Sequence, residues 1–449
     1  MIRSIAANRL RICGGRKSSP ILAKLPVRQQ PQSVGAERSY VTGYQYRSAN
    51  KYSSVAALDD EVRSYDTIPE DVMELVEEYC QKKQTPVSMH ALVKAGRHSA
   101  DNDNLMRNGS LNQYSSASGK VLIQAANFLC DELPVRLAHR INDLDKVPFM
   151  RDMPSVQLVK GIYINSFVDL VRYGSIATNE DEAAFAHFLN KKYEKHANVL
   201  IQMARGAYEL RQQQNDQVEF SQLQDCHEFL DRFYMSRIGI RVLAGQYLAL
   251  RQTPLPDYIG MICLRTSPYE LVRQAARDAT KMCQRKYGEA PEVQINGRTD
   301  LTFPYIPTYL HYILLELLKN AMRATVERHS DATGRALPPV QVIVADEHDN
   351  EDVVIKVADV GGGIPRSNLK KVWSYLFTTA DPKIQEDFIG DRDHDAQNSP
   401  LAGLGFGLPI SRSYARYFNG ELTIMSMEGW GTDAYVHLAR LEDPDQEFS

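Results

Sequence analysis

The sequence predicts an N-terminal helical bundle followed by an α/β domain. Apolar residues recur at intervals of three and four from about residue 121 to 250, the spacing of amphipathic helices. Helical stretches then alternate with short β-branched runs after Pro254 and Pro256. The chain has 449 residues, of which 43% are hydrophobic, so two or three domains with buried cores are expected.

The first forty residues are basic, and Glu37 is their first acidic residue. Arginine, lysine and serine without acids are typical of a mitochondrial transit peptide, which we predict for residues 1–40. A disordered basic tail is the alternative. A secretory signal fits worse because basic residues interrupt the apolar core that it needs. Residues 41–66, polar and rich in Ser and Tyr, are predicted to be a flexible lead-in.

Residues 67–257 are predicted to form the helical bundle, with a polar insertion at about 98–119. Three of its helices are indicated by apolar positions on one face: Leu122, Ala125, Ala126 and Leu129; Val156, Val159, Tyr163 and Phe167; and Phe229, Phe233, Ile238 and Leu243.

The α/β domain is predicted for residues 258–441, with a short tail at 442–449. Its expected helices are about 268–287 and 307–328. The expected strands are 293–295, 340–345, 353–357, 421–425 and 434–438.

Composition disfavours several classes of protein. The formal net charge of −4 provides no bulk attraction to nucleic acid, which is not expected as a partner. The six cysteines are scattered and include no C-x-x-C pair, so neither a zinc site nor a disulfide framework is indicated. No apolar run reaches the roughly 18 residues of a membrane span.

A first group of candidate site residues lies on the helix around Leu310–Thr325. Glu316, Asn320 and Arg323 are spaced at i, i+4 and i+7, so they project from one face beside an apolar stripe. An Asn carbonyl can ligate Mg²⁺, and a carboxylate one turn earlier can accept a proton. The alternative is a solvated helix face.

A second group follows the strand that ends at Asp359. This carboxylate can accept a hydrogen bond from an adenine amino group, while Gly361 and Gly363 let the backbone approach the base closely. Alone, an Asp followed by glycines is most often a turn.

A third group is the glycine-rich segment Gly403, Leu404, Gly405, Phe406, Gly407 and Leu408, which runs into a helix with Pro409 near its first turn. Such a turn directs backbone N–H groups towards an anion such as a triphosphate. Thr432, after one more glycine turn, adds a hydroxyl. The polar stretch 378–401 is predicted to be a lid over the nucleotide, with a passive surface loop as the alternative.

These motifs occur in one order and at one characteristic spacing, and together they resemble the ATP site shared by histidine kinases, type II topoisomerases and the Hsp90 chaperone. The resemblance implies a histidine-kinase-like (GHKL) ATP-binding α/β sandwich for the second domain. A P-loop or an ordinary protein kinase is disfavoured, since neither the P-loop motif nor a His-Arg-Asp loop occurs.

Over about residues 85–441 the chain also resembles the mitochondrial 2-oxo acid dehydrogenase kinases, which comprise the pyruvate and branched-chain 2-oxoacid dehydrogenase kinases. The resemblance lies in the strings Glu132–Arg140, Pro154–Val159, Met235–Arg241 and Glu316–Thr325. It implies a mitochondrial matrix enzyme that phosphorylates serine on the E1α subunit of a dehydrogenase complex.

The same resemblance implies roles for individual residues. Glu316 is the general base, Lys319 assists at the phosphates, and Asn320 holds Mg²⁺. Further nucleotide contacts fall on Arg323, Asp359, Thr378, Thr379, the segment 403–408 and Thr432. The implied cofactors are ATP, Mg²⁺ and K⁺.

The helical domain is expected to bind the lipoyl domain of E2 and a regulatory oxo acid, with Arg237 as a candidate contact. A salt bridge inside the bundle is the alternative role for Arg237. A homodimer is also expected. His196 is not interpreted as a phosphoacceptor, because a lone helical His is more often structural.

The leading substrate is the pyruvate dehydrogenase complex. Tyr312 resembles the residue found in the branched-chain kinases, whereas the segments 154–159 and 426–433 resemble the pyruvate dehydrogenase kinases. The branched-chain complex therefore stays an alternative substrate. An alternative of another class is a pseudokinase or scaffold that binds ATP and the E2 core without transferring phosphate.

Overall fold

The structure is a computed structural model that describes residues 70–97, 119–213, 220–253, 255–329, 336–346, 352–380 and 405–440. Several predicted segments lie outside the described residues: the transit peptide, the lead-in, the short tail, nearly all of the insertion, and the lid beyond Ala380.

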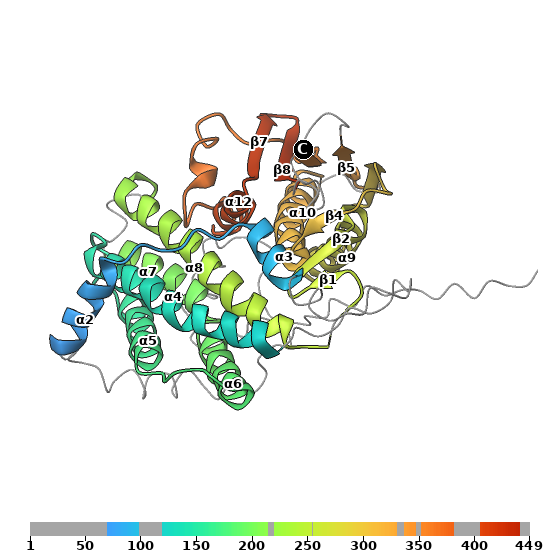
Figure 1. Cartoon of the computed structure of the whole chain (residues 1–449). Helices are drawn as coiled ribbons and strands as arrows, with labels where there is room; N and C mark the ends of the chain where they lie inside the picture. The colour runs from blue at the N-terminus through green and yellow to red at the C-terminus, as the bar shows by residue number, and fades with distance from the viewer. Residues whose placement is uncertain are drawn as a thin grey trace, which may run out of the picture. The chain divides into compact units, whose positions relative to one another are not determined.

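The N-terminal part is helical, as the sequence predicts, and Figure 1 shows it in blue to yellow-green. Its helices are α2 (Glu70–Cys80), α3 (Met89–Arg97), α4 (Gly119–Lys146), α5 (Pro154–Val171), α6 (Asn179–Lys195), α7 (Val199–Gln213) and α8 (Gln224–Leu250), with a 3₁₀ turn η2 (Phe220–Gln222) before α8. The three predicted apolar stripes lie on α4, α5 and α8. These helices pack on one another around the buried side chains of Leu129, Phe167 and Phe233.

Local signals account for where some of these helices begin. Pro154 occupies the first turn of α5, where its missing N–H would have no intrahelical partner. A capping box starts α6: the Thr178 hydroxyl accepts the Asp181 N–H at 3.1 Å, and the Asp181 carboxylate accepts the Thr178 N–H at 2.9 Å.

The C-terminal part contains helices and two sheets. Its elements are β1 (Tyr258–Ile259), β2 (Ile262–Thr266), α9 (Pro268–Tyr287), β3 (Val293–Gly297), β4 (Phe303–Tyr305), α10 (Pro307–His329), β5 (Val340–Asp346), β6 (Asp352–Asp359), η3 (Lys371–Trp373), α12 (Gly407–Tyr417), β7 (Glu421–Met427) and β8 (Gly431–Ala439). The predicted helices and strands are confirmed. The small antiparallel sheet β1-β2-β4 was not predicted.

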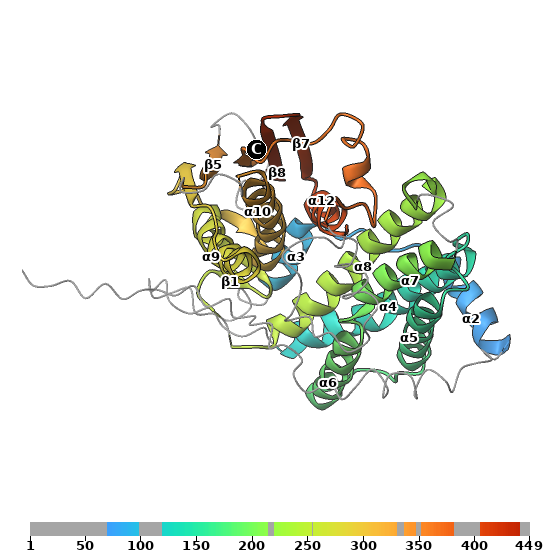
Figure 2. The same ribbon diagram turned by 180° about the vertical axis from the view of Figure 1, so that it is seen from behind.

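The larger sheet has the order β3-β5-β6-β8-β7, with β3 parallel to β5 and the other neighbours antiparallel. Helices α9, α10 and α12 pack on one face of it, as Figures 1 and 2 show from opposite sides. Val342 and Ile355 are buried on that face, whereas Ile343 is exposed. The result is the two-layer α/β sandwich predicted from the sequence.

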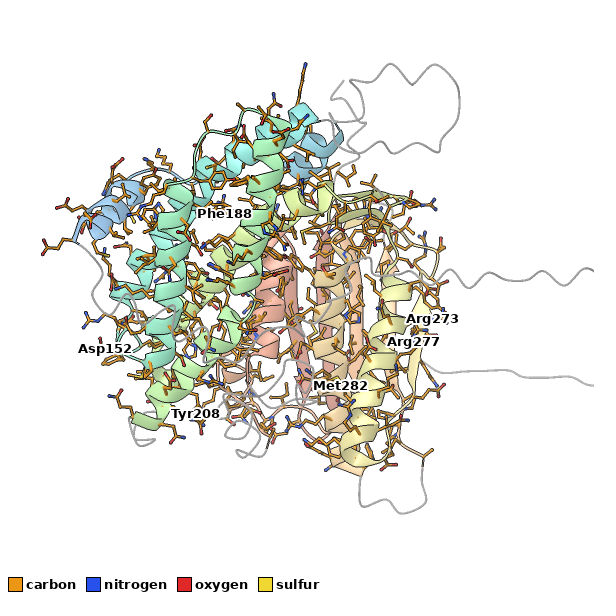
Figure 3. The ribbon with its side chains drawn as sticks, turned by 90° about the horizontal axis from the view of Figure 1, so that it is seen from below. Asp152, Phe188, Tyr208, Arg273, Arg277 and Met282 are labelled. Atoms are coloured by element: carbon orange, nitrogen blue, oxygen red, sulfur yellow. The ribbon has the colours of Figure 1, made fainter. Side chains whose placement is uncertain are left out.

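Helix α9 illustrates how its sequence divides between core and solvent. Ala275, Ala276 and Ala279 are buried, while Arg273 and Arg277 are exposed and extend from its outer side in Figure 3. None of the described helices combines the length and apolar character needed to cross a membrane.

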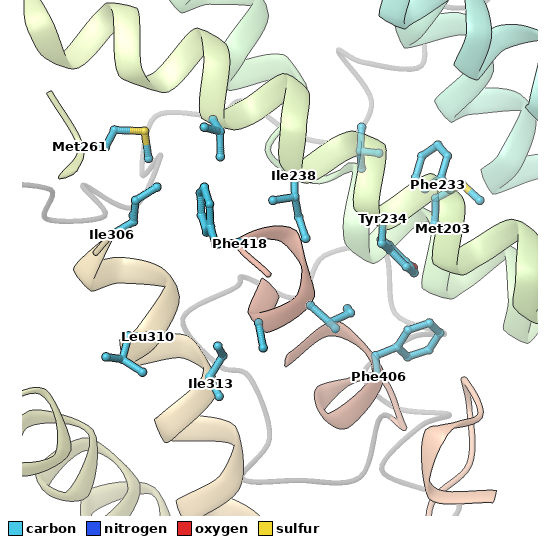
Figure 4. Close-up of a cluster of buried hydrophobic side chains, with 14 of the residues drawn as sticks. Met203, Phe233, Tyr234, Ile238, Met261, Ile306, Leu310, Ile313, Phe406 and Phe418 are labelled. Atoms are coloured by element: carbon cyan, nitrogen blue, oxygen red, sulfur yellow. The ribbon is translucent and has the colours of Figure 1, made fainter. Parts of the chain in front are cut away.

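The helical and α/β elements share one hydrophobic core, in which α8 packs against α12. Figure 4 shows part of it, including Ile238 of α8 beside Phe418 at the end of α12. Gly239 permits this approach, since a Cβ there would lie 3.1 Å from both Arg136 Nη1 and the Tyr417 hydroxyl. The fold therefore places one helix of the bundle directly against the helix that follows the glycine-rich turn.

Candidate active site

Helix α10 supplies the first wall of the candidate site. Leu310, Ile313, Leu314, Leu317 and Ala321 are buried along one side, as the apolar stripe predicts. The side chains of Glu316, Asn320 and Arg323 are partly exposed on the neighbouring face. In the structure these three residues therefore lie on one face of α10, as their spacing predicts.

Glu316 lies between a lysine and the start of α12. Lys319 Nζ forms an ion pair with Glu316 Oε1 at 2.8 Å, and Lys319 is only 4% exposed. A buried ammonium needs such a counter-ion, so this lysine fixes the position of the carboxylate. A Cβ at Gly407 would lie 2.4 Å from Glu316 Oε2, so a side chain at this position would displace the carboxylate from the first turn of α12.

Asp359 ends β6 beside the glycine turn. Its Oδ1 accepts the Gly361 N–H at 2.8 Å, and the carboxylate also accepts the backbone N–H of Thr432. Burial raises the pKa of Asp359 to about 6, and these two hydrogen bonds oppose the rise. At neutral pH the side chain is mostly a carboxylate and can accept further hydrogen bonds.

Close backbone contacts explain the glycines after Asp359. A Cβ at Gly361 would lie 2.5 Å from Ala324 Cβ of α10. Gly363 has φ +71°, and its Cβ would lie 2.1 Å from the Met427 carbonyl oxygen. The turn is thus held between α10 and the β7–β8 connection, and any side chain would force these elements apart.

The start of α12 forms another wall. Gly405 adopts φ +77°, and Phe406 occupies the N-cap without a side-chain hydrogen bond to the first turn. Pro409 near the N-terminus has no N–H of its own. Uncapped N–H groups at a helix N-terminus, aided by the helix dipole, suit an anion. Gly403 and Leu404 lie outside the described residues.

Threonine side chains complete the arrangement. Arg323 Nη2 donates to Thr379 Oγ1 at 3.1 Å, while Thr378 Oγ1 accepts the Ala380 N–H at 3.0 Å. The Thr432 hydroxyl lies 2.9 Å from Ser426 Oγ, which also accepts the Ile364 N–H at 2.7 Å. Sequence spacing gave no signal for Ser426, because it meets Thr432 only through the β7–β8 register.

The described residues of this site suit a magnesium ion that is bound together with a nucleotide. Asn320 offers an amide oxygen on the same helix face as Glu316. Among the described residues no group of three or more His, Cys, Asp or Glu side chains could hold a metal by itself. Mg²⁺ bound with phosphates typically needs only one or two protein ligands, so the single amide is compatible with it.

Arg237 lies elsewhere, on the buried side of α8. Its Nη2 donates to the carbonyl oxygens of His196 and Ala197, each at 3.1 Å, and its Nε has no hydrogen-bond partner among the described residues. Both of these partners are backbone carbonyls, and no carboxylate pairs with this guanidinium in the described part of the chain, which therefore shows no salt bridge for Arg237.

His196 is buried next to Arg237, and its Nε2 lies 2.8 Å from Ser166 Oγ. Burial, with the nearby charges of Arg237 and Arg241, lowers the pKa of His196 to about 3. The ring is therefore neutral and enclosed at physiological pH, which agrees with the view that it is not a phosphoacceptor.

Comparison with known proteins yields two family models. The model described as mitochondrial branched-chain alpha-ketoacid dehydrogenase kinase matches residues 86–263. The model described as histidine kinase-, DNA gyrase B-, and HSP90-like ATPase matches residues 306–442, which include α10, the Asp359 turn and α12. The second match and the observed sandwich identify the C-terminal part as an ATP-binding domain of that ATPase class.

Curated relatives narrow the assignment. An Arabidopsis thaliana protein named pyruvate dehydrogenase (acetyl-transferring) kinase, mitochondrial, is 40% identical over 86% of this chain and 98% of its own length. A Schizosaccharomyces pombe protein of the same name is 37% identical over 71% of this chain and 89% of its own. Human pyruvate dehydrogenase (acetyl-transferring) kinase isozyme 4, mitochondrial, is 38% identical over 71% of this chain and 77% of its own length. The chain belongs to the mitochondrial 2-oxo acid dehydrogenase kinase family.

Proposed function

We propose that this chain is a mitochondrial matrix protein serine kinase that uses ATP to phosphorylate and inactivate the E1α subunit of the pyruvate dehydrogenase complex. Family membership and the names of the relatives support this proposal. The observation that carries it is the Glu316 carboxylate, paired with Lys319 at the uncapped first turn of α12. A carboxylate in that place can take the proton from a serine hydroxyl as it attacks a bound phosphate.

Other side chains and backbone groups bind the adenine and the phosphates of ATP. Asp359 accepts the adenine amino hydrogen, and the backbone of the Gly361–Gly363 turn lies against the base. Backbone N–H groups of the glycine-rich segment bind the phosphates. Phosphoryl transfer depends mainly on such positioning and on neutralising charge. The remaining proposed nucleotide contacts are Arg323, Thr378, Thr379, Gly403, Leu404, Gly405, Phe406, Gly407, Leu408 and Thr432.

Asn320 is the proposed protein ligand of Mg²⁺. This ion, when bound with ATP, neutralises charge on the phosphates. Lys319 assists through its ion pair, which keeps Glu316 oriented towards the start of α12. K⁺ is proposed on the family resemblance alone.

The helical domain is proposed to bind the lipoyl domain of E2 and a regulatory oxo acid. Arg140, Arg237 and Arg241 lie close enough to buried Tyr163 for their charges to lower its pKa, although burial raises that pKa overall. Arg140 and Arg237 each have a buried Nε without a hydrogen-bond partner among the described residues. Clustered cations with spare donors suit a small carboxylate such as an oxo acid.

A homodimer is also proposed. Strand β7 forms one edge of the larger sheet, and it carries Met425 and Met427, which are 65% and 68% exposed. Exposed apolar side chains on an edge strand favour pairing with another chain, and a second copy presents the same surface.

The direct test incubates the protein with labelled ATP and either purified pyruvate dehydrogenase complex or purified branched-chain complex. We expect labelled serine on E1α of the pyruvate complex together with loss of that complex's activity. Labelling of the branched-chain complex alone would make that complex the substrate, the alternative that Tyr312 favours. Labelling of neither complex, with ATP still bound, would indicate the pseudokinase or scaffold.

A further inference from the structure

Tyr375 is a buried residue that joins the candidate ATP site to the helical bundle. It follows η3 and is 1% exposed. Its hydroxyl donates to Asp231 Oδ1 of α8 at 2.6 Å, a contact between residues 144 positions apart. A short hydrogen bond to a carboxylate is among the stronger kinds in proteins, so this contact ties the segment after η3 to α8.

Three further rings hold Tyr375 in place. His227 stacks on it at 5.9 Å with an interplanar angle of 14°, Tyr234 lies at 5.4 Å, and Phe406 lies at 5.5 Å. Figure 4 shows Tyr234 on α8 and Phe406 at the start of α12. The Tyr375 ring packs against both of them. The Tyr375 ring thus contacts both α8 and the glycine-rich turn.

The backbone of Tyr375 is held as well. His227 Nε2 lies 3.0 Å from the Phe220 carbonyl oxygen, to which it donates. That tautomer leaves Nδ1 as an acceptor for the Tyr375 N–H, at 3.4 Å. Both the ring and the main chain of Tyr375 are therefore fixed relative to α8.

The residues on each side of this contact line the candidate nucleotide site. Leu376 adopts φ +63°, and a Cβ at Gly405 would lie 2.5 Å from the Leu376 carbonyl carbon. Three residues further on, Thr379 accepts from Arg323 of α10. Beyond Phe406, Gly407 lies against the Glu316 carboxylate. The segment 376–379 and the start of α12, two walls of the site, thus meet next to Tyr375.

We propose that Tyr375, held by Asp231, is a positioning residue for nucleotide binding: it sets the backbone of residues 376–379 and 405–407 against α10 through a contact with the helical domain. The inference rests on the proposed function, because it takes this site to be the ATP site. Tyr375 and Asp231 act through the walls that they support and do not touch the nucleotide.

The test measures Mg–ADP binding to the full chain by calorimetry, alongside thermal unfolding. Tyr375→Phe keeps the ring packing but removes the hydrogen bonds of the hydroxyl to Asp231 and Ser413, and should weaken binding about tenfold. Asp231→Ala should do the same, and Asp231→Asn, which keeps an acceptor, about threefold. Because the two groups act together, the double variant Tyr375→Phe/Asp231→Ala should lose about tenfold and not about a hundredfold.

Tyr305→Phe is the matched control. Tyr305 is another buried tyrosine of the α/β domain, and its hydroxyl has no hydrogen-bond partner among the described residues. We expect its variant to bind Mg–ADP within about twofold of the wild type. In kinase assays Tyr375→Phe should raise the KM for ATP more than it lowers kcat, a split that a general loss of folded protein would not produce.

Several outcomes would overturn the inference. One is that Tyr375→Phe binds Mg–ADP as tightly as Tyr305→Phe does, whatever its melting temperature. Another is a hundredfold loss in the double variant, which would mean that the residues act independently. If Asp231→Ala fails to fold, Tyr375→Phe and Asp231→Asn decide. A wild-type protein that binds no Mg–ADP would defeat the proposed function itself, whereas normal wild-type binding with unaffected variants would defeat only this inference.

Discussion

The candidate ATP site and the surroundings of Arg237 are built in different ways. The ATP site depends on glycines that allow close contacts: Gly361 meets α10, Gly363 meets the Met427 carbonyl, and Gly407 meets the Glu316 side chain. Around Arg237 a side chain of α8 instead reaches backbone carbonyls 40 and 41 residues away, at the end of α6. Glycine-rich turns can be recognised from their spacing in the sequence, whereas contacts between residues far apart in the chain cannot.

The two regions also differ in their response to protons. Asp359 in the ATP site has a pKa of about 6, whereas His196 beside Arg237 has a pKa of about 3. Desolvation is the main cause in both, but it favours the neutral form, which raises the pKa of an acid and lowers that of a base. Between pH 5 and 8 only the first of these side chains changes its charge.

Glu316→Gln should have the largest effect, and it acts on the ATP region alone. Losing the general base should lower kcat by about 10²- to 10⁴-fold, because the amide cannot accept the serine proton. Mg–ADP affinity should change by no more than about threefold, since the side-chain volume is kept. Glu292→Gln, which alters an exposed glutamate before β3, is the control. Full activity in Glu316→Gln would remove this residue from the role of base.

Gly363→Ala tests whether the close backbone contacts matter beyond the left-handed conformation itself. Gly288 also has a left-handed φ of +82°, but a Cβ there meets nothing within 4 Å. Both variants should lose about 1–2 kcal/mol of stability from the unfavourable φ, measured by urea unfolding. Gly363→Ala should lose more than Gly288→Ala, because its Cβ would also meet the Met427 carbonyl oxygen. Only Gly363→Ala should also weaken Mg–ADP binding, by about 30-fold if displacing the turn costs about 2 kcal/mol. Equal binding by the two variants would contradict the proposed role of this turn.

The pH dependence of binding should separate the two regions. Adenine needs the Asp359 carboxylate as an acceptor, so Mg–ADP affinity should be constant above the pKa of about 6 and fall below it. At pH 5 the dissociation constant should be about tenfold higher than at pH 8, because about nine in ten Asp359 side chains are then protonated. Binding of an oxo acid near Arg237 should stay constant, since His196 is neutral throughout this range.

Calorimetric titrations at pH 5, 6, 7 and 8 measure both constants. Asp359→Asn should bind Mg–ADP more weakly at pH 8 and lose the dependence near pH 6. A dependence that persists in that variant would show that another group titrates.

Arg237→Gln should have a smaller effect, confined to the helical domain. A neutral amide at this position should weaken pyruvate binding about fivefold, because one of the clustered charges is lost. Arg232→Gln is the control, since Arg232 lies on the same helix but its side chain is 63% exposed. If both variants bind pyruvate equally well, Arg237 is not a regulatory contact.

The fold was predictable where signals are local. Ser267 caps α9 by accepting the Glu270 N–H at 3.3 Å, Pro268 follows it, and Gly288 ends the helix, so the predicted bounds of α9 match the structure. The β1-β2-β4 sheet was missed because β1 has two residues, β4 has three, and the register between β2 and β4 shifts. Such short strands show no alternation that a sequence could reveal.

The same distinction applies to the site. The face of Glu316, Asn320 and Arg323 follows from helical spacing. The placement of Glu316 beside Gly407 and the contact of Tyr375 with Asp231 arise only when distant elements pack. The partners of Arg237 cannot be read from its sequence neighbours, so the sequence left both a regulatory contact and a salt bridge open. The structure shows hydrogen bonds to two backbone carbonyls.

Hydrogen–deuterium exchange with and without Mg–ADP tests most directly whether one nucleotide site is formed by these elements. We expect slower exchange on nucleotide addition in residues 359–363, 405–410 and 431–432 and on the exposed face of α10, with little change in β1, β2 and β4. Protection that is absent from those segments, or that appears mainly in the β1-β2-β4 sheet, would contradict the site.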